Sequence, residues 1–173
     1  MSKIDYKAFI EENFFIKNKQ GILVPFVFNE VQDNWYQDLI NEYGEELQGI
    51  RENDLKGRQF GISSVITGIF ATDFILSELG IIPIIDSDIY SHKDSETDAH
   101  IARFNLFLNS YMIQDQGGGI EQMEDIEAIE KLRKAFLEID NGGHLNTRKR
   151  GAQYHAQTAS AKVSGRGGTT QNI

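Results

Sequence analysis

The chain has 173 residues, which fits one domain of ordinary size, and 40% of them are hydrophobic, enough to build a core. It has no cysteine, which excludes a disulfide scaffold and any thiolate metal site. The net charge of −9 argues against a general nucleic-acid coat protein, and no apolar run approaches the roughly 20 residues that span a bilayer. We therefore expect a soluble, non-secreted protein without a membrane partner.

The N-terminal part of the sequence predicts two helices separated by an extended segment. Residues 5–16 have the apolar spacing of a short amphipathic helix. Residues 18–29 predict a hairpin-like extended segment, in which Pro25 disfavours a central strand. Residues 30–44 predict a second helix that ends at Gly44, because apolar residues recur every four positions at Val31, Trp35, Leu39 and Tyr43.

The central part begins with a glycine loop, LKGRQFGISS (55–64). The apolar run that follows predicts a helix over 63–80, and we expect it to be buried against a sheet. Residues 81–92 are the best strand candidate, with Pro83 at its start or at a sheet edge. Residues 95–112 predict the next helix.

The C-terminal part predicts one more helix and one more strand. The helix covers 123–140 and ends at the Asn-Gly-Gly run, and the strand covers 152–161. The inward side of the helix over 123–140 is expected to carry Met123, Ile126, Ile129, Leu132 and Phe136. Strands that alternate with helices predict an α/β layer fold with a mostly parallel sheet. No repeat or linker divides the chain, so we expect one domain over 1–173, with 1–44 as its lead-in.

Charge is unevenly distributed along the chain. Acidic residues crowd positions 121–130, whereas 141–173 contains no acidic residue and carries Arg148, Lys149, Arg150, Lys162 and Arg166. This basic segment could contact phosphates. Charge alone favours a solvated surface or loop.

The glycine loop contains every residue type that a phosphate cradle needs. A cradle requires glycine for inward-facing backbone N–H groups, a helix start that favours anions, a cation and a hydroxyl for Mg²⁺. Lys56 and Arg58 lie before Gly61, and Ser63 and Ser64 stand at the start of the helix. A curled loop would bring the displaced cations to the same phosphates.

The loop nevertheless departs from the standard phosphate-loop pattern. That pattern has four residues between its glycines and a lysine after the second glycine. Here only three residues separate Gly57 from Gly61, and Ile62 takes the place of the lysine. By itself, the loop also fits a simple turn before a helix. A metal site at His92 and His100 is a weaker alternative, because a helix cap explains the acids between them.

Three further segments accompany the loop in a fixed order: ILVPFVFNEVQDNWY (22–36), DSDIYSHKDSETDAHIARFNLFL (86–108) and YHAQTASAKVSGRGGTTQNI (154–173). The ordered set resembles the N-terminal ATPase domain of the large terminase subunit of tailed phages, the motor that packages DNA into the procapsid. That family has a similar segment with Gln before a variant Walker A loop. It then has a strand ending in Ser/Ala-His, and a strand with an RGxT turn before Walker B.

The resemblance implies a P-loop NTPase-like three-layer sandwich that binds ATP and Mg²⁺. Gln32 matches the family's adenine-sensing glutamine, and Lys56 or Arg58 matches the Walker A cation. The hydroxyl of Ser63 or Ser64 would face Mg²⁺, and residues 166–169 match the turn before Walker B. The implied nucleotide site comprises Gln32, Lys56, Gly57, Arg58, Gly61, Ser63 and Ser64.

Two departures from the family change the expected activity. The segment before the loop, GIRENDL (49–55), is charged where the family has an apolar strand, so this strand is short or the loop is held differently. The family's Walker B acid follows the RGxT turn, whereas this chain stops at Ile173. We therefore expect a sheet that is incomplete at its C-terminal end and a catalytic acid beyond Ile173. We also expect no nuclease domain, and nucleotide binding without efficient hydrolysis.

By resemblance, the partners of the full-length protein are double-stranded DNA, the portal and the small terminase subunit. It would work in the host cytoplasm and transiently at the procapsid portal. A second hypothesis is a non-catalytic interaction module, or an orphan terminase fragment, that self-associates through an open sheet edge without using nucleotide. In a third, the chain is an unrelated α/β domain whose glycine loop is only a turn.

Overall fold

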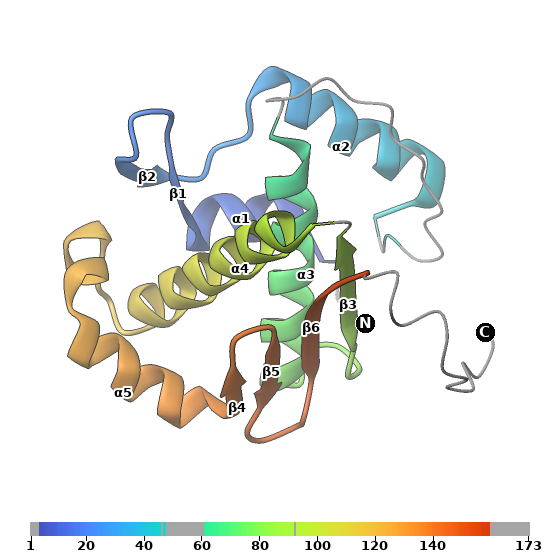
Figure 1. Cartoon of the computed structure of the whole chain (residues 1–173). Coiled ribbons are helices and arrows are strands. Elements are labelled where there is room, and N and C mark those ends of the chain that lie inside the picture. The colour runs from blue at the N-terminus through green and yellow to red at the C-terminus, as the bar shows by residue number, and fades with distance from the viewer. Residues whose placement is uncertain (1–3, 46, 48–60, 92, 160–173) are drawn as a thin grey trace.

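The computed structural model describes residues 4–45, 47, 61–91 and 93–159. In Figure 1, helix α3 runs through the middle, α4 crosses beside it, and a sheet lies at one end. The elements are α1 (Tyr6–Asn13), β1 (Phe15–Lys17), β2 (Leu23–Pro25), α2 (Glu30–Tyr43), α3 (Ile62–Leu79), β3 (Ser87–Ser91), α4 (Asp94–Asp115), the 3-10 helix η1 (Ile120–Glu124), α5 (Ile126–Phe136), β4 (Leu137–Asn141), β5 (His144–Thr147) and β6 (Gln153–Thr158).

The N-terminal elements agree with their expected order. The carboxylate of Asp5 caps α1 by accepting a hydrogen bond from the Ala8 amide at 2.9 Å. The helix ends at Asn13, earlier than expected, because the next residues form β1 and pair antiparallel with β2. Pro25 ends the short strand β2 of this two-stranded sheet, where its missing N–H is tolerated.

Helices α2 and α3 begin and end close to the predicted positions, but the buried face of α2 differs from the prediction. Its buried residues are Gln32, Tyr36 and Leu39, whereas Val31 is 44% exposed. The expected apolar stripe is therefore displaced by one residue at its start. The displacement has a local cause, because the Gln32 side chain is turned inward by the contacts described below.

Helix α3 is long and apolar enough to cross a membrane by length and composition, but 72% of its residues are buried inside the protein. It ends at Gly80, whose left-handed backbone has φ 75°. The predicted burial of this helix is confirmed, but α3 packs mainly against the helices α1, α2 and α4 and not against a sheet as expected. The structure is compatible with a soluble protein, in which α3 is the central core helix.

Aromatic side chains form the core around α3. Phe107 of α4 stacks on Phe14 and on Phe26, with ring centroids 4.9 and 5.5 Å apart. Phe104, also on α4, meets Phe74 of α3 edge-on and stacks on Tyr154 of β6. These rings join the N-terminal hairpin, both long helices and the sheet into one apolar cluster.

The predicted mostly parallel three-layer sandwich is wrong. The larger sheet has four strands in the order β3-β6-β5-β4, and only the β3–β6 pair is parallel. Parallel neighbours need a crossover of about a dozen residues or more. The two-residue turn Gly142-Gly143 and the short segment 148–152 are too short for that, so β5 runs antiparallel to both of its neighbours, β4 and β6.

The C-terminal half also differs in the extent of its elements. The helix expected over 123–140 is divided into η1 and α5, and it stops at Phe136 because the residues up to Asn141 pair with β5. Ile126, expected inside, is 71% exposed. The strand expected over 81–92 is limited to β3, since Ile81 and Ile82 turn back and donate to the Leu76 carbonyl at the end of α3.

One carboxyl group is buried in the middle of α3. Asp73 is 8% exposed and accepts a hydrogen bond of 2.7 Å from the Tyr6 hydroxyl of α1. Burial raises the pKa of Asp73 to about 6, and the Tyr6 hydrogen bond opposes that rise. Between about pH 4 and pH 6 the folded state therefore binds more protons at Asp73 than the unfolded chain does.

We predict that Asp73 destabilises the fold as pH rises. Its contribution to the free energy of unfolding is largest below about pH 4 and is lost as pH passes about 6, because the folded pKa is the higher one. The stability advantage of Asp73→Asn over the wild type should grow by on the order of 2–3 kcal/mol from pH 4 to pH 7. Urea unfolding measures it, with Asp98→Asn on the exposed side of α4 as control. Parallel pH profiles for the wild type and Asp73→Asn would contradict the prediction.

Candidate functional site

The side chain of Gln32 connects the start of α2 to the start of α3. Asn29 and Gln32 form a reciprocal capping box, with Gln32 N donating to Asn29 Oδ1 at 3.0 Å and Asn29 N donating to Gln32 Oε1 at 2.9 Å. Gln32 Nε2 donates to the carbonyl oxygen of Gly61 at 3.0 Å. Two residues predicted for the nucleotide site, 29 positions apart, are therefore in direct contact.

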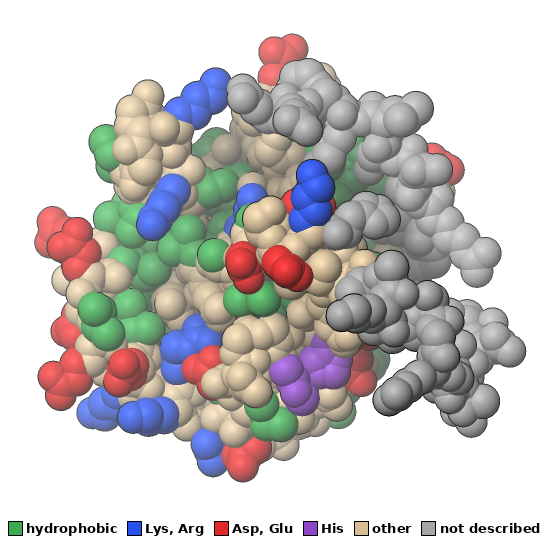
Figure 2. All heavy atoms as spheres, in the orientation of Figure 1, with side chains coloured by type: hydrophobic (Ala, Val, Ile, Leu, Met, Phe, Trp, Pro, Cys, Tyr) green, Lys and Arg blue, Asp and Glu red, His purple; other side chains and the backbone are tan. Residues whose placement is uncertain are grey.

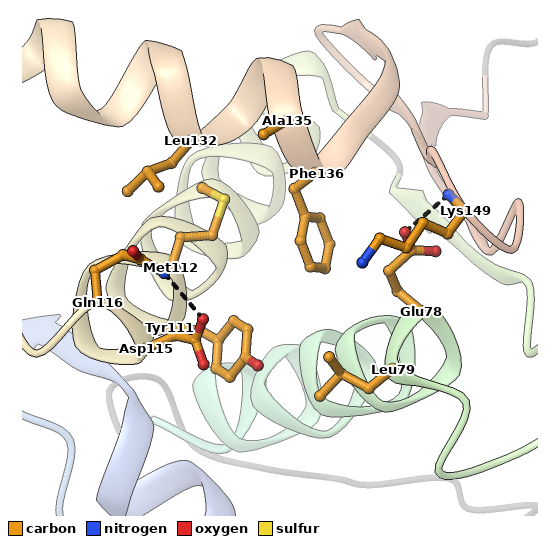
Figure 3. Close-up of a pocket in the computed structure, with 10 residues that line it drawn as sticks. All are labelled: Glu78, Leu79, Tyr111, Met112, Asp115, Gln116, Leu132, Ala135, Phe136 and Lys149. Atoms are coloured by element: carbon orange, nitrogen blue, oxygen red, sulfur yellow. Dashed lines mark hydrogen bonds between the residues drawn. The ribbon is translucent and has the colours of Figure 1, made fainter.

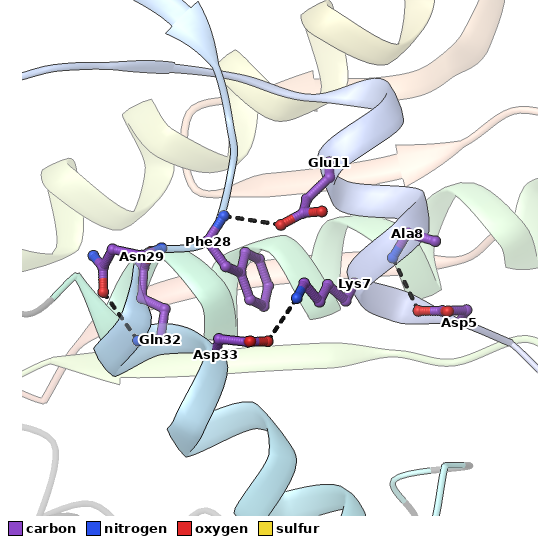
Figure 4. A network of polar contacts seen from close by, with 8 residues as sticks. All are labelled: Asp5, Lys7, Ala8, Glu11, Phe28, Asn29, Gln32 and Asp33. Carbon is purple, nitrogen blue, oxygen red and sulfur yellow. Dashed lines mark hydrogen bonds and ion pairs between the residues drawn. The ribbon is translucent and has the colours of Figure 1, made fainter.

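Helix α1 holds the start of α2 in place, as Figure 4 shows. Lys7 Nζ lies 2.6 Å from Asp33 Oδ1, and Glu11 Oε1 accepts a 2.9 Å hydrogen bond from the Phe28 amide. Phe28 itself is buried against the edge of the Tyr36 ring. These contacts hold Phe28, the residue before the Asn29 cap. They therefore fix the position of the first turn of α2, which carries Gln32.

Gly61 occupies a position that only glycine fits. Its φ of 76° and ψ of 10° lie in the left-handed region, which residues other than glycine rarely adopt. A Cβ atom there would lie 2.6 Å from Gln32 Nε2. The missing side chain therefore lets Gln32 pack directly against the backbone of the turn.

Ser63 and Ser64 occupy the first turn of α3, as expected. Ser64 is buried at 7% exposure, and its amide donates to the Gly61 carbonyl at 2.9 Å. Ser63 is half-buried, and its carbonyl accepts a 2.7 Å hydrogen bond from the Thr67 hydroxyl. No side chain in the described residues caps α3 at Gly61. The backbone N–H groups of this first turn carry the partial positive charge of a helix N-terminus.

The remaining predicted site residues cannot be placed. Lys56, Gly57 and Arg58 lie outside the described residues, as does the 166–169 turn. His92 lies outside them too. Within the described ranges, no group of three or more histidine, aspartate or glutamate side chains could hold a metal ion.

A cavity that was not anticipated from the sequence lies directly beside Ser64. It has a volume of about 420 Å³ and is bounded by β1, the first turn of α3, and α4. Its polar lining consists of Lys17, Ser64, Arg103, Asn105 and Asn109. A sequence signal did exist: Arg103 has no acidic residue three or four positions away on its helix, where an ion-pair partner would normally stand.

A second cavity, of about 430 Å³, lies at the opposite end of α3 (Figure 3). Leu79, Met112, Leu132 and Phe136 give it an apolar wall. Glu78 stands at its rim and accepts hydrogen bonds from the amides of Lys149 and Arg150, at 2.8 and 2.9 Å. It is separated from Ser64 by about 20 Å along the helix, so it does not belong to the turn at Gly61.

Comparison with known proteins gives no relative: no protein-family model, no curated protein and no solved structure matches the chain. Inferences about its activity therefore depend on its own residues and their geometry.

We predict that Gly61→Ala destabilises the protein for two separable reasons. The left-handed backbone costs about 1–2 kcal/mol, and the overlap with Gln32 Nε2 adds to it. In a Gln32→Ala background the overlap is gone, so Gly61→Ala should cost about 1 kcal/mol less there. Urea unfolding of the four proteins in this double-mutant cycle measures the difference.

The control for this cycle is Gly21→Ala, which has φ 78° and no atom within 4 Å of the added Cβ. It should be unaffected by the Gln32→Ala background. If Gly61→Ala lowers the free energy of unfolding equally with and without Gln32, the Gln32 side chain does not overlap with the added Cβ.

Proposed function

We propose that the chain binds ATP with Mg²⁺ at the Gly61–Ser64 turn and is the ATP-binding part of a viral DNA-packaging motor of the large-terminase type. The observation that supports it is the contact of Gln32 with Gly61, two residues that the resemblance assigns to one site and that are distant in sequence. The proposal depends on this local geometry and on the ordered sequence motifs. It does not depend on the sheet, whose topology differs from the expected one.

Each residue of the turn has a physical role in this proposal. Gly61 lets the backbone approach the phosphates closely, and the N-terminus of α3 favours their negative charge. Lys56 or Arg58 supplies the cation. A serine hydroxyl, Ser63 or Ser64, reaches Mg²⁺, which also binds phosphate oxygens and water and so needs few protein ligands.

Gln32 has a positioning role before any ligand binds. Within the described residues, its amide oxygen accepts from Asn29 and its amide nitrogen donates to Gly61, so this buried side chain holds the start of α2 against the turn. A base that bound here would sense the position of the turn through the same side chain. In the proposed setting, double-stranded DNA, the portal and the small terminase subunit are the partners. The protein then works in the host cytoplasm and transiently at the procapsid portal.

The double variant Lys56→Ala/Arg58→Ala is predicted to weaken binding of a non-hydrolysable ATP analogue with Mg²⁺ by about tenfold or more, because charge-assisted contacts to phosphate are lost. Isothermal titration calorimetry on the whole chain measures it. Lys19→Ala/Lys131→Ala removes the same charge from exposed sites and is the matched control. If both double variants bind the analogue as the wild type does, the loop is not the nucleotide site.

A second candidate function is self-association, and the structure offers one observation in its favour. Within the described residues β3 is an end strand that pairs only with β6, and its Tyr90 is 65% exposed. Helices α3 and α4 lie on one side of this sheet, and no described helix covers the other side (Figure 1). Figure 2 shows that side, with histidine side chains in purple gathered on it. We propose that a second copy pairs along β3.

Self-association along β3 predicts a concentration-dependent mass in light scattering. Tyr90→Lys should shift the protein towards monomer, because lysine on an edge strand opposes pairing with another strand. Ile126→Lys changes an equally exposed apolar side chain on α5 and should leave the mass unchanged. A monomer at every concentration would exclude this second function.

A further inference from the structure

The cavity beside Ser64 has a mixed lining without an acidic residue: Ile16, Ala102 and Leu106 are apolar, and the other five residues carry hydrogen-bond donors. Lys17 comes from β1, Ser64 from the first turn of α3, and Arg103 from α4. The chain has a net charge of −9, but this cavity is lined by two cations and by no carboxylate. The volume of about 420 Å³ is in the range of small-ligand sites.

The guanidinium of Arg103 has no ionic or hydrogen-bonding partner within the described ranges 4–45, 47, 61–91 and 93–159. It is half-buried, and burial lowers its pKa. The Tyr154 hydroxyl, whose pKa responds to the Arg103 charge, is itself buried without a hydrogen-bond partner in that part of the chain. Buried charges in proteins are normally paired, so a half-buried arginine that has no partner among the described residues and lies beside a cavity is placed to bind an anion that enters the cavity.

The two asparagines of the cavity are oriented by a neighbouring arginine. Arg133 forms a bidentate pair with Asp140, at 2.7 and 2.6 Å, which fixes its guanidinium. The same guanidinium donates to Asn109 Oδ1 at 2.9 Å and to Asn105 Oδ1 at 3.0 Å. Because Arg133 occupies both amide oxygens, the amide N–H groups are what these side chains can offer to a ligand.

We propose that this cavity binds the phosphate groups of a small polyphosphate anion, with Arg103 and Lys17 as its cationic ligands and Ser64, Asn105 and Asn109 as its hydrogen-bond donors. Arginine and asparagine donors in this number match the many acceptor oxygens of a phosphate chain. The cavity shares Ser64 with the turn at Gly61. The assignment of the anion as the phosphate chain of a nucleotide therefore rests on the proposed function, whereas the anion site itself rests on the cavity.

Tripolyphosphate and ATP are the probes that test the cavity, with binding to the whole chain measured by calorimetry. Arg103→Gln should weaken binding of each by about tenfold or more, and Lys17→Ala should weaken it less, because Lys17 is exposed. Lys19→Ala, two positions along from Lys17 and outside the lining, should bind as the wild type does. Unchanged binding of both probes in Arg103→Gln would overturn the proposal.

The thermal stability of Arg103→Met separates a ligand role from a structural one. In phosphate-free buffer this variant should melt at the same or a higher temperature than the wild type, because it removes an unpaired, half-buried charge. Tripolyphosphate should stabilise the wild type and leave the variant unchanged. A variant that melts lower in phosphate-free buffer would show that Arg103 supports the fold, and would overturn the proposal.

The double variant Lys56→Ala/Arg58→Ala distinguishes the nucleotide site at the loop from the anion site in the cavity. Tripolyphosphate binding that depends on Arg103 but not on Lys56 and Arg58 supports the cavity and removes the loop. The reverse result supports the loop and removes the cavity. A short DNA duplex is the last probe: if it binds through Arg103 and tripolyphosphate does not, the site recognises a nucleic-acid backbone and the small-polyphosphate proposal fails.

Discussion

The burial of α3 is the constraint on which the rest of the structure depends. An apolar helix of 18 residues has no polar face to turn to water, so other elements must cover it on every side. The contacts that do so are spaced along its length: Gln32 at its first turn, the Tyr6 hydroxyl on Asp73, the Phe104 ring on Phe74, and the Lys149 and Arg150 amides on Glu78. Each joins a different element to α3.

The covering of α3 is not purely apolar, and this shapes both ends of the helix. Asp73 and Glu78 are buried carboxyls, and each is tied to one neighbouring element by hydrogen bonds. At the N-terminus, Gln32 lies against the backbone of Gly61, and a cavity is lined in part by Ser64. Both proposed anion sites lie at this end, where the helix dipole is positive and the described part of the chain places no carboxylate in the cavity lining.

The extents of α2 and α3 could be predicted because local signals mark their ends. Asn29 and Gln32 form a capping box within one turn, and Gly44 and Gly80 end their helices through their own positive φ angles. The sheet could not be predicted equally well. The residues after Phe136 continue a helix-like apolar spacing, and only the pairing of Leu137–Asn141 with β5 across Gly142-Gly143 makes them a strand. The direction of β5 and β6 then follows from connections too short for a crossover.

The sequence by itself determined the extents of α2 and α3, the extended N-terminal hairpin, the glycine turn before α3 and the residue types of a phosphate cradle, because capping and turn preferences act within a few residues. Only the tertiary structure decided which strands pair, that Gln32 bonds the Gly61 carbonyl, and that Arg103 stands beside a cavity with no ion-pair partner among the described residues. These depend on packing between residues far apart in the chain. The burial and pairing of a charge are properties of its surroundings in space, and neighbours in sequence do not reveal them.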